Sequence, residues 1–240
     1  MDLINTLKNI YLSIKNGETA KLVNSGYVSA KVTHCGSKTG GFDVVMPDQF
    51  VAKDGVAMSF GIGEDLSFSE DLRRLSGIKI YAFDPTPRSV EYVKNHRLSG
   101  DEGFKFFDYG ISDRNEEADF HLPVDSSHVS GSMERYSGVR EESIKVQMKS
   151  FSTICSKLGI SRVDILKMDI EGSEFKVMPS ILKSGVDVPQ ICIETHERFF
   201  PDKDAKFAAL FNLLYNKGYQ CVSKDYVESV YTFVKGSLIA

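Results

Sequence analysis

The sequence lacks the features that direct a chain into a membrane or an oxidising compartment. No apolar run is long enough to span a bilayer. The N-terminal stretch has neither the basic start nor the apolar core of a secretory signal. The four cysteines are widely separated and form no C-x-x-C pair, which is typical of reduced, buried thiols. We therefore expect a cytoplasmic protein without a membrane span.

Clusters of basic residues are also missing. The formal net charge is −4, and charged residues make up 26% of the chain, which is close to the globular average. Lysines and arginines are scattered along the sequence, whereas binding to a phosphate backbone needs a concentrated basic surface. We therefore expect no nucleic-acid partner. With 240 residues and no internal repeat, the chain is long enough for one large α/β domain.

The glycine motif of dinucleotide-binding proteins is incomplete. Gly61 and Gly63 follow the short apolar run Val56–Phe60, but Leu66 occupies the position of the third glycine in G-x-G-x-x-G. No G-K-[ST] follows either, which excludes a P-loop. Two glycines after a buried strand still predict a strand-to-helix turn that a nucleotide-like ligand can approach closely.

Acidic residues lie at this turn and at the end of the next strand. Glu64 and Asp65 would repel a pyrophosphate, but they suit the cationic amino and sulfonium groups of S-adenosylmethionine. Asp84 closes the next strand, about 20 residues beyond the glycines, where an acid accepts hydrogen bonds from ribose hydroxyls. The pattern favours S-adenosylmethionine as the cofactor, with an NAD-dependent oxidoreductase as the less favoured alternative.

Strand-like and helix-like patterns alternate along the chain, which predicts an α/β fold with a doubly wound, mostly parallel sheet. The expected strands are Val56–Phe60, 78–84, Phe104–Phe107, Val163–Met168, Ile191–Glu194, and an antiparallel closing pair, Tyr219–Ser223 and Ser229–Val234. The expected helices are 66–75, 87–95, Phe151–Leu158, 173–182 and 204–217.

Two segments fall outside this alternation. Residues 1–50 are interpreted as an N-terminal helix (residues 2–15, ended by Gly17) followed by an irregular segment with a short strand at 42–45. The latter caps the sheet or shapes an acceptor pocket, and residues 51–240 form the cofactor-binding domain. Residues 113–143 are polar and rich in turn-forming residues. A long loop with one short strand, Ala118–Leu122, is expected there, as a candidate mobile lid near the acceptor. An exposed strand is expected over Ile144–Lys149.

Further functional candidates follow three of the predicted strands. Asp108 and Ile111 come after Phe104–Phe107, where they can flank an adenine ring, although an ordinary polar turn is an open alternative. Asp169 and Glu171 follow the strand that ends at Met168, and carboxylates at this edge can hold a cation, act as a base or bind a metal. A helix cap is the alternative interpretation.

The strand Ile191–Glu194 leads into His196. A histidine beside a carboxylate at a strand end is a plausible base, since its pKa lies near neutrality. A structural histidine is the open alternative.

Four stretches together resemble the FkbM family of class I S-adenosylmethionine-dependent methyltransferases: SFGIGEDLSFSEDL, YAFDPTP, LKMDIEGSEF and IETH. The resemblance covers roughly residues 40–235. It implies a Rossmann-like, mostly parallel seven-stranded sheet in the order 3-2-1-4-5-7-6, with helices on both faces. It also implies O-methylation of hydroxyls on sugars, glycans, glycolipids or polyketide-type metabolites, so the expected partner is a glycan or small-molecule acceptor. The turn departs from the fuller G-x-G-x-G form, because Asp65 stands at its third glycine position.

The resemblance assigns roles to individual residues. Gly61 and Gly63 would line the methionine moiety, Asp84 would bind the ribose, and Asp169 and Glu171 would lie near the transferred methyl group. The cofactor-binding candidates are Phe60, Gly61, Gly63, Asp65, Asp84, Thr86, Asp108, Ile111, Asp169 and Glu171.

The reaction expected from these residues is a direct in-line displacement. A sugar hydroxyl is too weak an acid to ionise alone near pH 7, so it needs a base or a metal that lowers its pKa. The catalytic candidates are Asp169, Glu194 and His196, and Mg²⁺ held by Asp169 and Glu194 is an alternative to a protein base. A non-catalytic S-adenosylmethionine-binding domain of a larger glycan-modifying protein remains a second interpretation. The sequence leaves the oligomeric state open.

Overall fold

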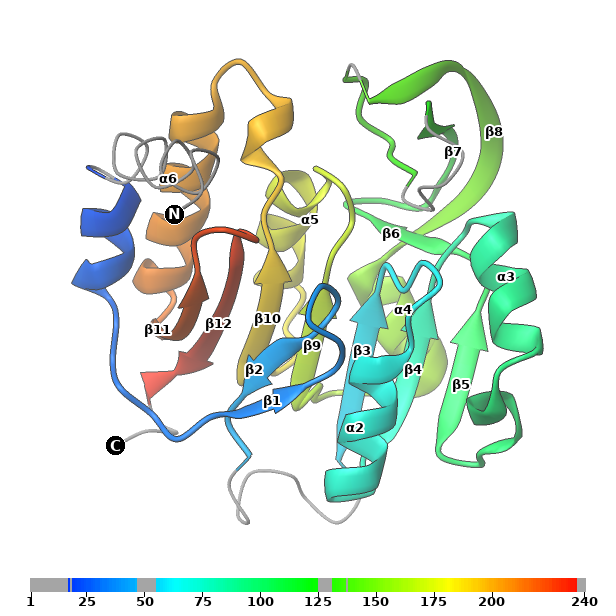
Figure 1. The fold of residues 1–240 in the computed structure, drawn as a ribbon, viewed down its shortest axis with the longest axis horizontal. Helices are drawn as coiled ribbons and strands as arrows, with labels where there is room; N and C mark the ends of the chain where they lie inside the picture. Colours follow the sequence, from blue (N-terminus) through cyan, green and yellow to red (C-terminus); the bar gives the residue numbers. More distant parts are fainter. Residues whose placement is uncertain (1–16, 18, 47–54, 125–130, 137, 237–240) are drawn as a thin grey trace, which may run out of the picture.

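A seven-stranded sheet forms the centre of the computed structural model, which describes residues 17, 19–46, 55–124, 131–136 and 138–236 (Figure 1). The strands are β3 (Val56–Phe60), β4 (Lys79–Phe83), β5 (Phe104–Phe107), β9 (Ile165–Met168), β10 (Gln190–Glu194), β11 (Tyr219–Asp225) and β12 (Val230–Lys235). Their spatial order is β5-β4-β3-β9-β10-β12-β11, and β12 alone runs antiparallel to its neighbours. Numbered along the chain, this order is 3-2-1-4-5-7-6, so the prediction is confirmed.

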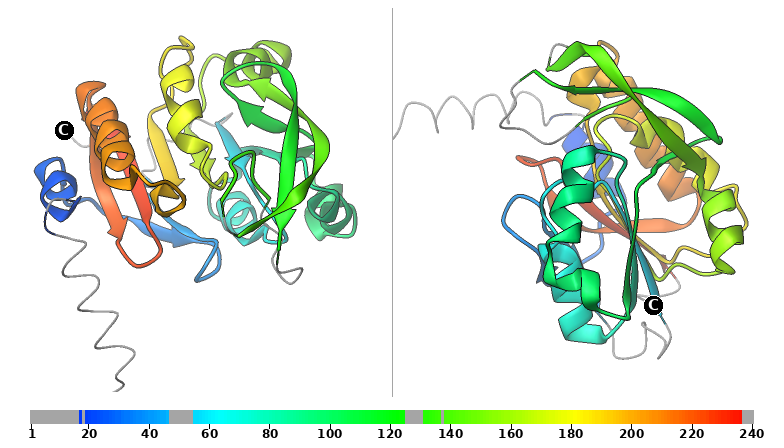
Figure 2. Two further views of the ribbon diagram at one scale, coloured as in Figure 1. Left: turned by 90° about the horizontal axis from the view of Figure 1, so that it is seen from above. Right: turned by 90° about the vertical axis from the view of Figure 1, so that its right-hand side faces the viewer.

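Helices cover both faces of the sheet (Figure 2). They are α2 (Ser67–Ser76), α3 (Pro87–Lys94), α4 (Phe151–Leu158), α5 (Glu174–Ile181) and α6 (Lys203–Asn216), with short 3₁₀ turns η1 (Arg97–Gly100) and η2 (Glu197–Phe199). One apolar cluster joins the sheet to α2 and α3, and a second joins it to α4, α5 and α6. The continuous apolar runs of the central strands follow from this burial on two sides. Among the described helices, none has the length and apolar character needed to cross a bilayer.

Local signals set the ends of these helices. Gly77 ends α2 in the left-handed conformation (φ 68°), Gly159 ends α4 in the same way, and Thr86 caps α3, which begins at Pro87. Ser150 caps α4 by accepting a hydrogen bond from the backbone N–H of Thr153. The sequence predicted each of these helices to within two residues.

A β-hairpin from the N-terminal segment packs against the main domain. Strands β1 (Thr33–Cys35) and β2 (Phe42–Val44) pair antiparallel, and Cys35, Phe42 and Val44 are buried in the same cluster as α2. The expected strand near Phe42 is confirmed. Residues 19–25 are helical, so the expectation of an irregular segment from residue 19 was wrong there. The helix expected over residues 2–15 lies outside the described residues.

A second, smaller sheet takes up part of the long loop expected over residues 113–143. Strands β6 (Gly110–Ser112), β7 (Glu116–Pro123) and β8 (Val139–Ser150) pair in the order β6-β8-β7. The expected strands 118–122 and 144–149 lie inside β7 and β8; β7 is slightly longer than expected, and β8 begins five residues earlier. Alternating burial along β7, with Phe120 at its apolar centre, explains the error: a strand with one exposed face has the same composition as a polar loop.

Candidate active site

A cavity of about 330 Å³ opens at the carboxyl edge of the sheet. Its volume is at the lower end of the range of ligand pockets. The turn after β3, the end of β4, the small sheet and the segment after β9 all contribute to its wall. The residues are Thr39, Gly40, Phe60, Gly61, Ile62, Gly63, Glu64, Asp65, Phe83, Asp84, Pro85, Thr86, Gly110, Ile111, Phe120, Gly131, Met133, Met148, Asp169, Ile170, Glu171 and Ser173.

The glycine turn requires glycine for two independent reasons. Gly61 has φ +73°, and a Cβ atom at this position would collide with the carbonyl oxygen of Asp169 on the neighbouring strand. Gly63 also has a positive φ, +53°. The turn therefore lies close against the end of β9, which brings the glycines and Asp169 to the same cavity.

Asp84 holds the glycine turn through its carboxylate. Oδ2 accepts hydrogen bonds from the backbone N–H groups of Ile62 and Gly63, both at 3.0 Å. Oδ1 accepts from the backbone N–H and the hydroxyl of Thr86, at 2.9 and 2.7 Å. Four accepted hydrogen bonds match the capacity of a carboxylate. Asp84 lines the cavity. A ribose hydroxyl would have to share or replace one of these four bonds, so the predicted contact with the ribose stays a prediction.

The N-terminal hairpin reaches this turn through Asp65. The hydroxyl of Ser37 donates to Asp65 Oδ2 at 2.6 Å, and the backbone N–H of Ser67 donates to Oδ1 at 2.8 Å. Burial raises the pKa of Asp65, but these hydrogen bonds and the charge of Lys167 outweigh burial, so the pKa lies below its usual value. The hairpin also brings Thr39 and Gly40 to the cavity wall. The sequence analysis gave this segment a role at the acceptor pocket as one alternative, but it did not single out these two residues.

Of the two residues expected to flank the adenine, one lines the cavity and the other does not. Ile111 is buried in β6 and lines the cavity, together with Phe60 and Thr86. Asp108 follows β5, is exposed, and is not among the lining residues. Met148, Met133 and the ring of Phe120 complete an apolar wall that the sequence did not identify.

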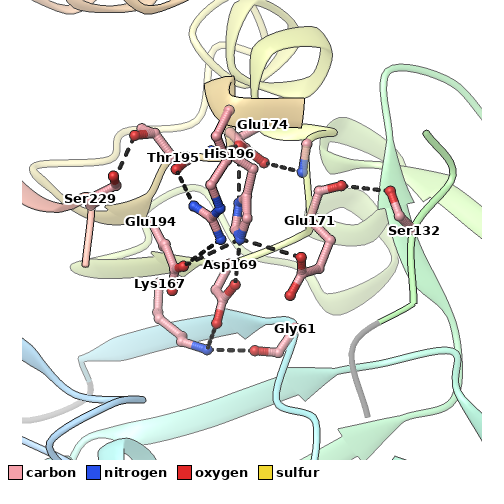
Figure 3. A network of polar contacts seen from close by, with 12 residues as sticks. Gly61, Ser132, Lys167, Asp169, Glu171, Glu174, Glu194, Thr195, His196 and Ser229 are labelled. Atoms are coloured by element: carbon pink, nitrogen blue, oxygen red, sulfur yellow. Dashed lines mark hydrogen bonds and ion pairs between the residues drawn. The ribbon is translucent and has the colours of Figure 1, made fainter. Parts of the chain in front are cut away.

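Three carboxylates converge on one buried histidine behind the cavity (Figure 3). Nε2 of His196 lies 3.3 Å from Glu194 Oε1, 3.4 Å from Glu171 Oε2 and 3.8 Å from Asp169 Oδ1. Asp169 and Glu171 follow β9, while Glu194 ends β10, the neighbouring parallel strand, and His196 follows it. The structure thus brings together all three predicted catalytic residues, Asp169, Glu194 and His196. Of these, Asp169 lines the cavity, and so does Glu171.

Glu174, in the first turn of α5, holds the other side of the histidine ring. Its Oε1 lies 3.2 Å from Nδ1 of His196 and accepts a hydrogen bond from the His196 backbone N–H at 2.6 Å. Its Oε2 accepts from the N–H of Gly172 at 3.0 Å, and the side chain is fully buried. The sequence analysis did not single out Glu174, because nothing local in the sequence shows that a residue in the first turn of a helix is buried against a histidine.

The pKa of His196 is raised well above its ordinary value. Burial lowers it, but the carboxylates of Glu174, Glu194 and Glu171 around the ring raise it by more. The cluster therefore favours a positive charge at the position of Nε2.

Lys167 connects the glycine turn to the acid cluster, which consists of Asp169, Glu171, Glu174 and Glu194 around His196. It is 4% exposed, and its Nζ donates a hydrogen bond to the carbonyl oxygen of Gly61 and lies 3.5 Å from Asp169 Oδ2. A lysine within a buried parallel strand is unusual. That position was the available signal, and the sequence analysis did not use it.

The segment before β8 covers the acid cluster. The hydroxyl of Ser132 donates to the carbonyl oxygen of Glu171 at 2.5 Å, and the ring of Tyr136 stacks on Phe199 of η2. Glu171 itself has φ +52°, a strained value for a residue with a side chain. These contacts tie the small sheet to the end of β9 beside the cavity.

The strand order, the cavity at the carboxyl edge and the glycine turn together define a class I methyltransferase. Residues 43–221 match the methyltransferase FkbM domain, and the chain belongs to this family of S-adenosylmethionine-dependent methyltransferases.

A curated relative agrees with this assignment. The chain is 26% identical over 138 residues to the 2-O-methyltransferase NoeI of Sinorhizobium fredii, a match that covers 52% of this chain and 56% of the relative. The chain thus spans little more than half the length of that relative.

The solved structures that are similar to this chain have low sequence identity and TM-scores below 0.5. The fibrillarin pre-rRNA processing protein of Methanococcus jannaschii is 11% identical, with a TM-score of 0.46 and coverage of 80% of this chain and 70% of that one. A precorrin-6y C5,15-methyltransferase from Geobacter metallireducens is 14% identical, with a TM-score of 0.37 and coverage of 76% and 82%. TYW2 of M. jannaschii, solved in complex with AdoMet, is 13% identical, with a TM-score of 0.35 and coverage of 86% of both chains.

Proposed function

We propose that the protein is an O-methyltransferase that transfers a methyl group from S-adenosylmethionine to a hydroxyl of a sugar, glycan or glycolipid. The observation that carries the proposal is a single cavity bordered on one side by the glycine turn and on the other by Asp169 and Glu171. A methyl donor on the turn and an acceptor beside the carboxylates would share this space.

The chemistry of the cavity wall fits the proposed cofactor. Glu64, Asp65, Asp169 and Glu171 place negative charge around the turn, which suits a sulfonium and an ammonium group and opposes a pyrophosphate. Ile111 and Met148 supply an apolar surface of the kind on which a flat ring packs. The same charge distribution argues against NAD(H).

The bound cofactor supplies a methyl group on a positively charged sulfur, which is already a good electrophile. The chain's residues then have to align the acceptor oxygen, exclude water and receive the hydroxyl proton. Transfer of the methyl group to the acceptor oxygen would leave S-adenosylhomocysteine as the other product. The proton passes to a carboxylate that lines the cavity, and Asp169 is the proposed acceptor.

His196 supports this base from behind. Its side chain is 1% exposed and does not line the cavity, so it acts through Asp169 and Glu171 rather than by touching the acceptor. Glu194 and Glu174 fix the ring on its other sides. His196 and Glu194 are therefore proposed as positioning residues, and Asp169 as the catalytic residue.

The acceptor class is proposed from the family and from the activity of the NoeI relative, a 2-O-methyltransferase. A cofactor-binding domain without transferase activity is the second candidate. The acid cluster beside the cavity favours a working site, because holding the turn alone would not require it.

The first test is calorimetric titration with S-adenosylhomocysteine and, separately, NADH. We expect the first to bind and the second not to bind. A panel of sugars and glycolipids is then assayed for methyl transfer with wild type, Asp169→Asn and the surface control Asp119→Asn. Loss of most turnover in Asp169→Asn alone, with S-adenosylhomocysteine binding intact, supports the proposal. Wild-type turnover in Asp169→Asn removes that carboxylate from the mechanism, and binding without transfer to any acceptor favours the second candidate.

A further inference from the structure

We propose that Asp169, Glu171 and His196 form a binding site for a divalent transition-metal ion of the Mn²⁺ type, open toward the cavity. The metal site is argued from the positions of these side chains alone. Its role in catalysis rests on the proposed function.

The spacing of the three side chains suits a shared ion. One ligand atom from each lies within 4.8 Å of the others. Nε2 of His196 is 3.4 Å from Glu171 Oε2 and 3.8 Å from Asp169 Oδ1. Two ligand atoms that are each about 2.1 Å from an ion are themselves about 3.0 to 3.5 Å apart in octahedral or tetrahedral geometry. Small rotations of side chains therefore bring all three to ligand distance.

The histidine supplies an independent observation. Among the described residues, Nε2 of His196 faces three carboxylate oxygens at 3.3 to 3.8 Å, but none of them meets hydrogen-bond geometry, and the side chain is only 1% exposed. A buried polar atom without a partner is costly. Figure 3 shows this nitrogen directed at the carboxylates. Glu174 faces the opposite ring nitrogen, at 3.2 Å from Nδ1, which is the arrangement that orients a metal-bound histidine.

The negative charge of the acid cluster also favours a bound cation. Four carboxylates, those of Asp169, Glu171, Glu174 and Glu194, surround the ring. Among the described residues, Lys167 lies 3.5 Å from Asp169 and Arg198 lies 3.6 Å from Glu194. A divalent ion would add positive charge at the point where the carboxylates approach one another.

The ligand types select among metals. An imidazole nitrogen with two carboxylates suits Mn²⁺, Fe²⁺ or Zn²⁺, whereas Mg²⁺ prefers oxygen ligands alone. The proposal thus differs from Mg²⁺ held by Asp169 and Glu194, which the sequence suggested. Three protein ligands leave coordination positions free, and two of the three ligands line the cavity. An acceptor hydroxyl bound there would have a lowered pKa and would lose its proton to a carboxylate oxygen that does not bind the ion.

The test uses the full chain after chelator treatment, without cofactor or acceptor. Mn²⁺ is titrated by calorimetry, and free Mn²⁺ is followed by its electron paramagnetic resonance signal. We expect one site per chain, and His196→Gln and Glu171→Gln should each weaken binding by roughly 100-fold. The matched control is His96→Gln, which alters a histidine that also faces a carboxylate, Glu70, but does not line the cavity.

Two outcomes overturn the site: wild type that binds no Mn²⁺ at millimolar concentration, or binding that both variants retain. Because His196 is buried, each variant's fold is checked by circular dichroism, and Glu171→Gln at the cavity wall decides the matter if His196→Gln does not fold. A parallel titration with S-adenosylhomocysteine separates the two proposals. Cofactor binding without Mn²⁺ binding rejects the metal site and leaves the methyltransferase proposal in place. Mn²⁺ binding without cofactor binding supports the metal site and rejects the methyltransferase proposal.

Discussion

Lys167 donates a hydrogen bond from the middle of the sheet to the carbonyl oxygen of Gly61. The same ammonium group lies 3.5 Å from a carboxylate oxygen of Asp169. One buried cation thus fixes the glycine turn relative to the proposed catalytic residue, and its removal should disturb both.

We expect Lys167→Met to keep the fold but to weaken S-adenosylhomocysteine binding about tenfold, since a hydrogen bond from a charged donor to the turn is lost. Calorimetry measures the change. Lys105→Met, at an exposed position of β5, is the control and should bind as wild type does. Equal affinities for wild type and Lys167→Met would show that the turn holds its shape without the ammonium group.

Asp84→Asn should lower the free energy of unfolding by about 1 to 3 kcal/mol, because one amide group cannot accept all four hydrogen bonds that the carboxylate accepts. Urea denaturation provides the measurement. Asp108→Asn, the same substitution after the neighbouring strand, should stay within about 0.5 kcal/mol of wild type, since Asp108 is exposed. Similar losses in both variants would contradict the role assigned to Asp84.

Gly61→Ala and Gly77→Ala should differ sharply in stability. Both glycines have positive φ, +73° and +68°, but a Cβ atom at Gly77 meets no atom within 4 Å. Gly77→Ala should cost about 1 kcal/mol for the left-handed backbone alone. Gly61→Ala adds a collision with the backbone of Asp169 and should cost at least about 3 kcal/mol. Thermal denaturation of the two variants checks the order, and a reversed order would refute the close approach of β3 and β9.

The stability of the N-terminal hairpin should depend on acid pH through Asp65. The pKa of this carboxyl is lower in the folded chain than the unfolded value of about 3.9. Its contribution is therefore complete above that unfolded value and is lost as the pH falls through the folded pKa. Asp65→Asn should flatten the fall in stability below about pH 4. Ser37→Ala, which removes one donor to Asp65, should flatten it partly, and parallel curves for all three proteins would argue against this linkage.

The main sheet was predictable because its signals are local. Each central strand is a short apolar run that ends in glycine, proline or an acid, and β3 and β5 have the bounds that the sequence predicted. Asp169 and His196 were found for a related reason: the carboxyl ends of neighbouring parallel strands lie at one edge.

The rest depends on contacts that the sequence does not encode locally. Whether the Asp84 carboxylate faces backbone N–H groups or open space depends on its side-chain conformation. The approach of Glu174 to His196 depends on how α5 packs behind β10. The contribution of Thr39 depends on where the hairpin of β1 and β2, which precedes β3 in the chain, comes to lie. Residues of β7 and β8 alternate between polar and apolar on a sheet with one exposed face, so composition alone could not separate them from a loop.

The small sheet has a consequence for how such an enzyme diversifies. Phe120, Val146 and Met148 form an apolar cluster of their own, separate from the two clusters that stabilise the main sheet. Phe120, Met133 and Met148 nevertheless line the cavity. Substitutions in this module can reshape one wall of the site while the seven-stranded scaffold and its glycine turn keep their packing. Under the proposed function, Phe120, Met133 and Met148 are therefore the natural positions at which to engineer the choice of acceptor.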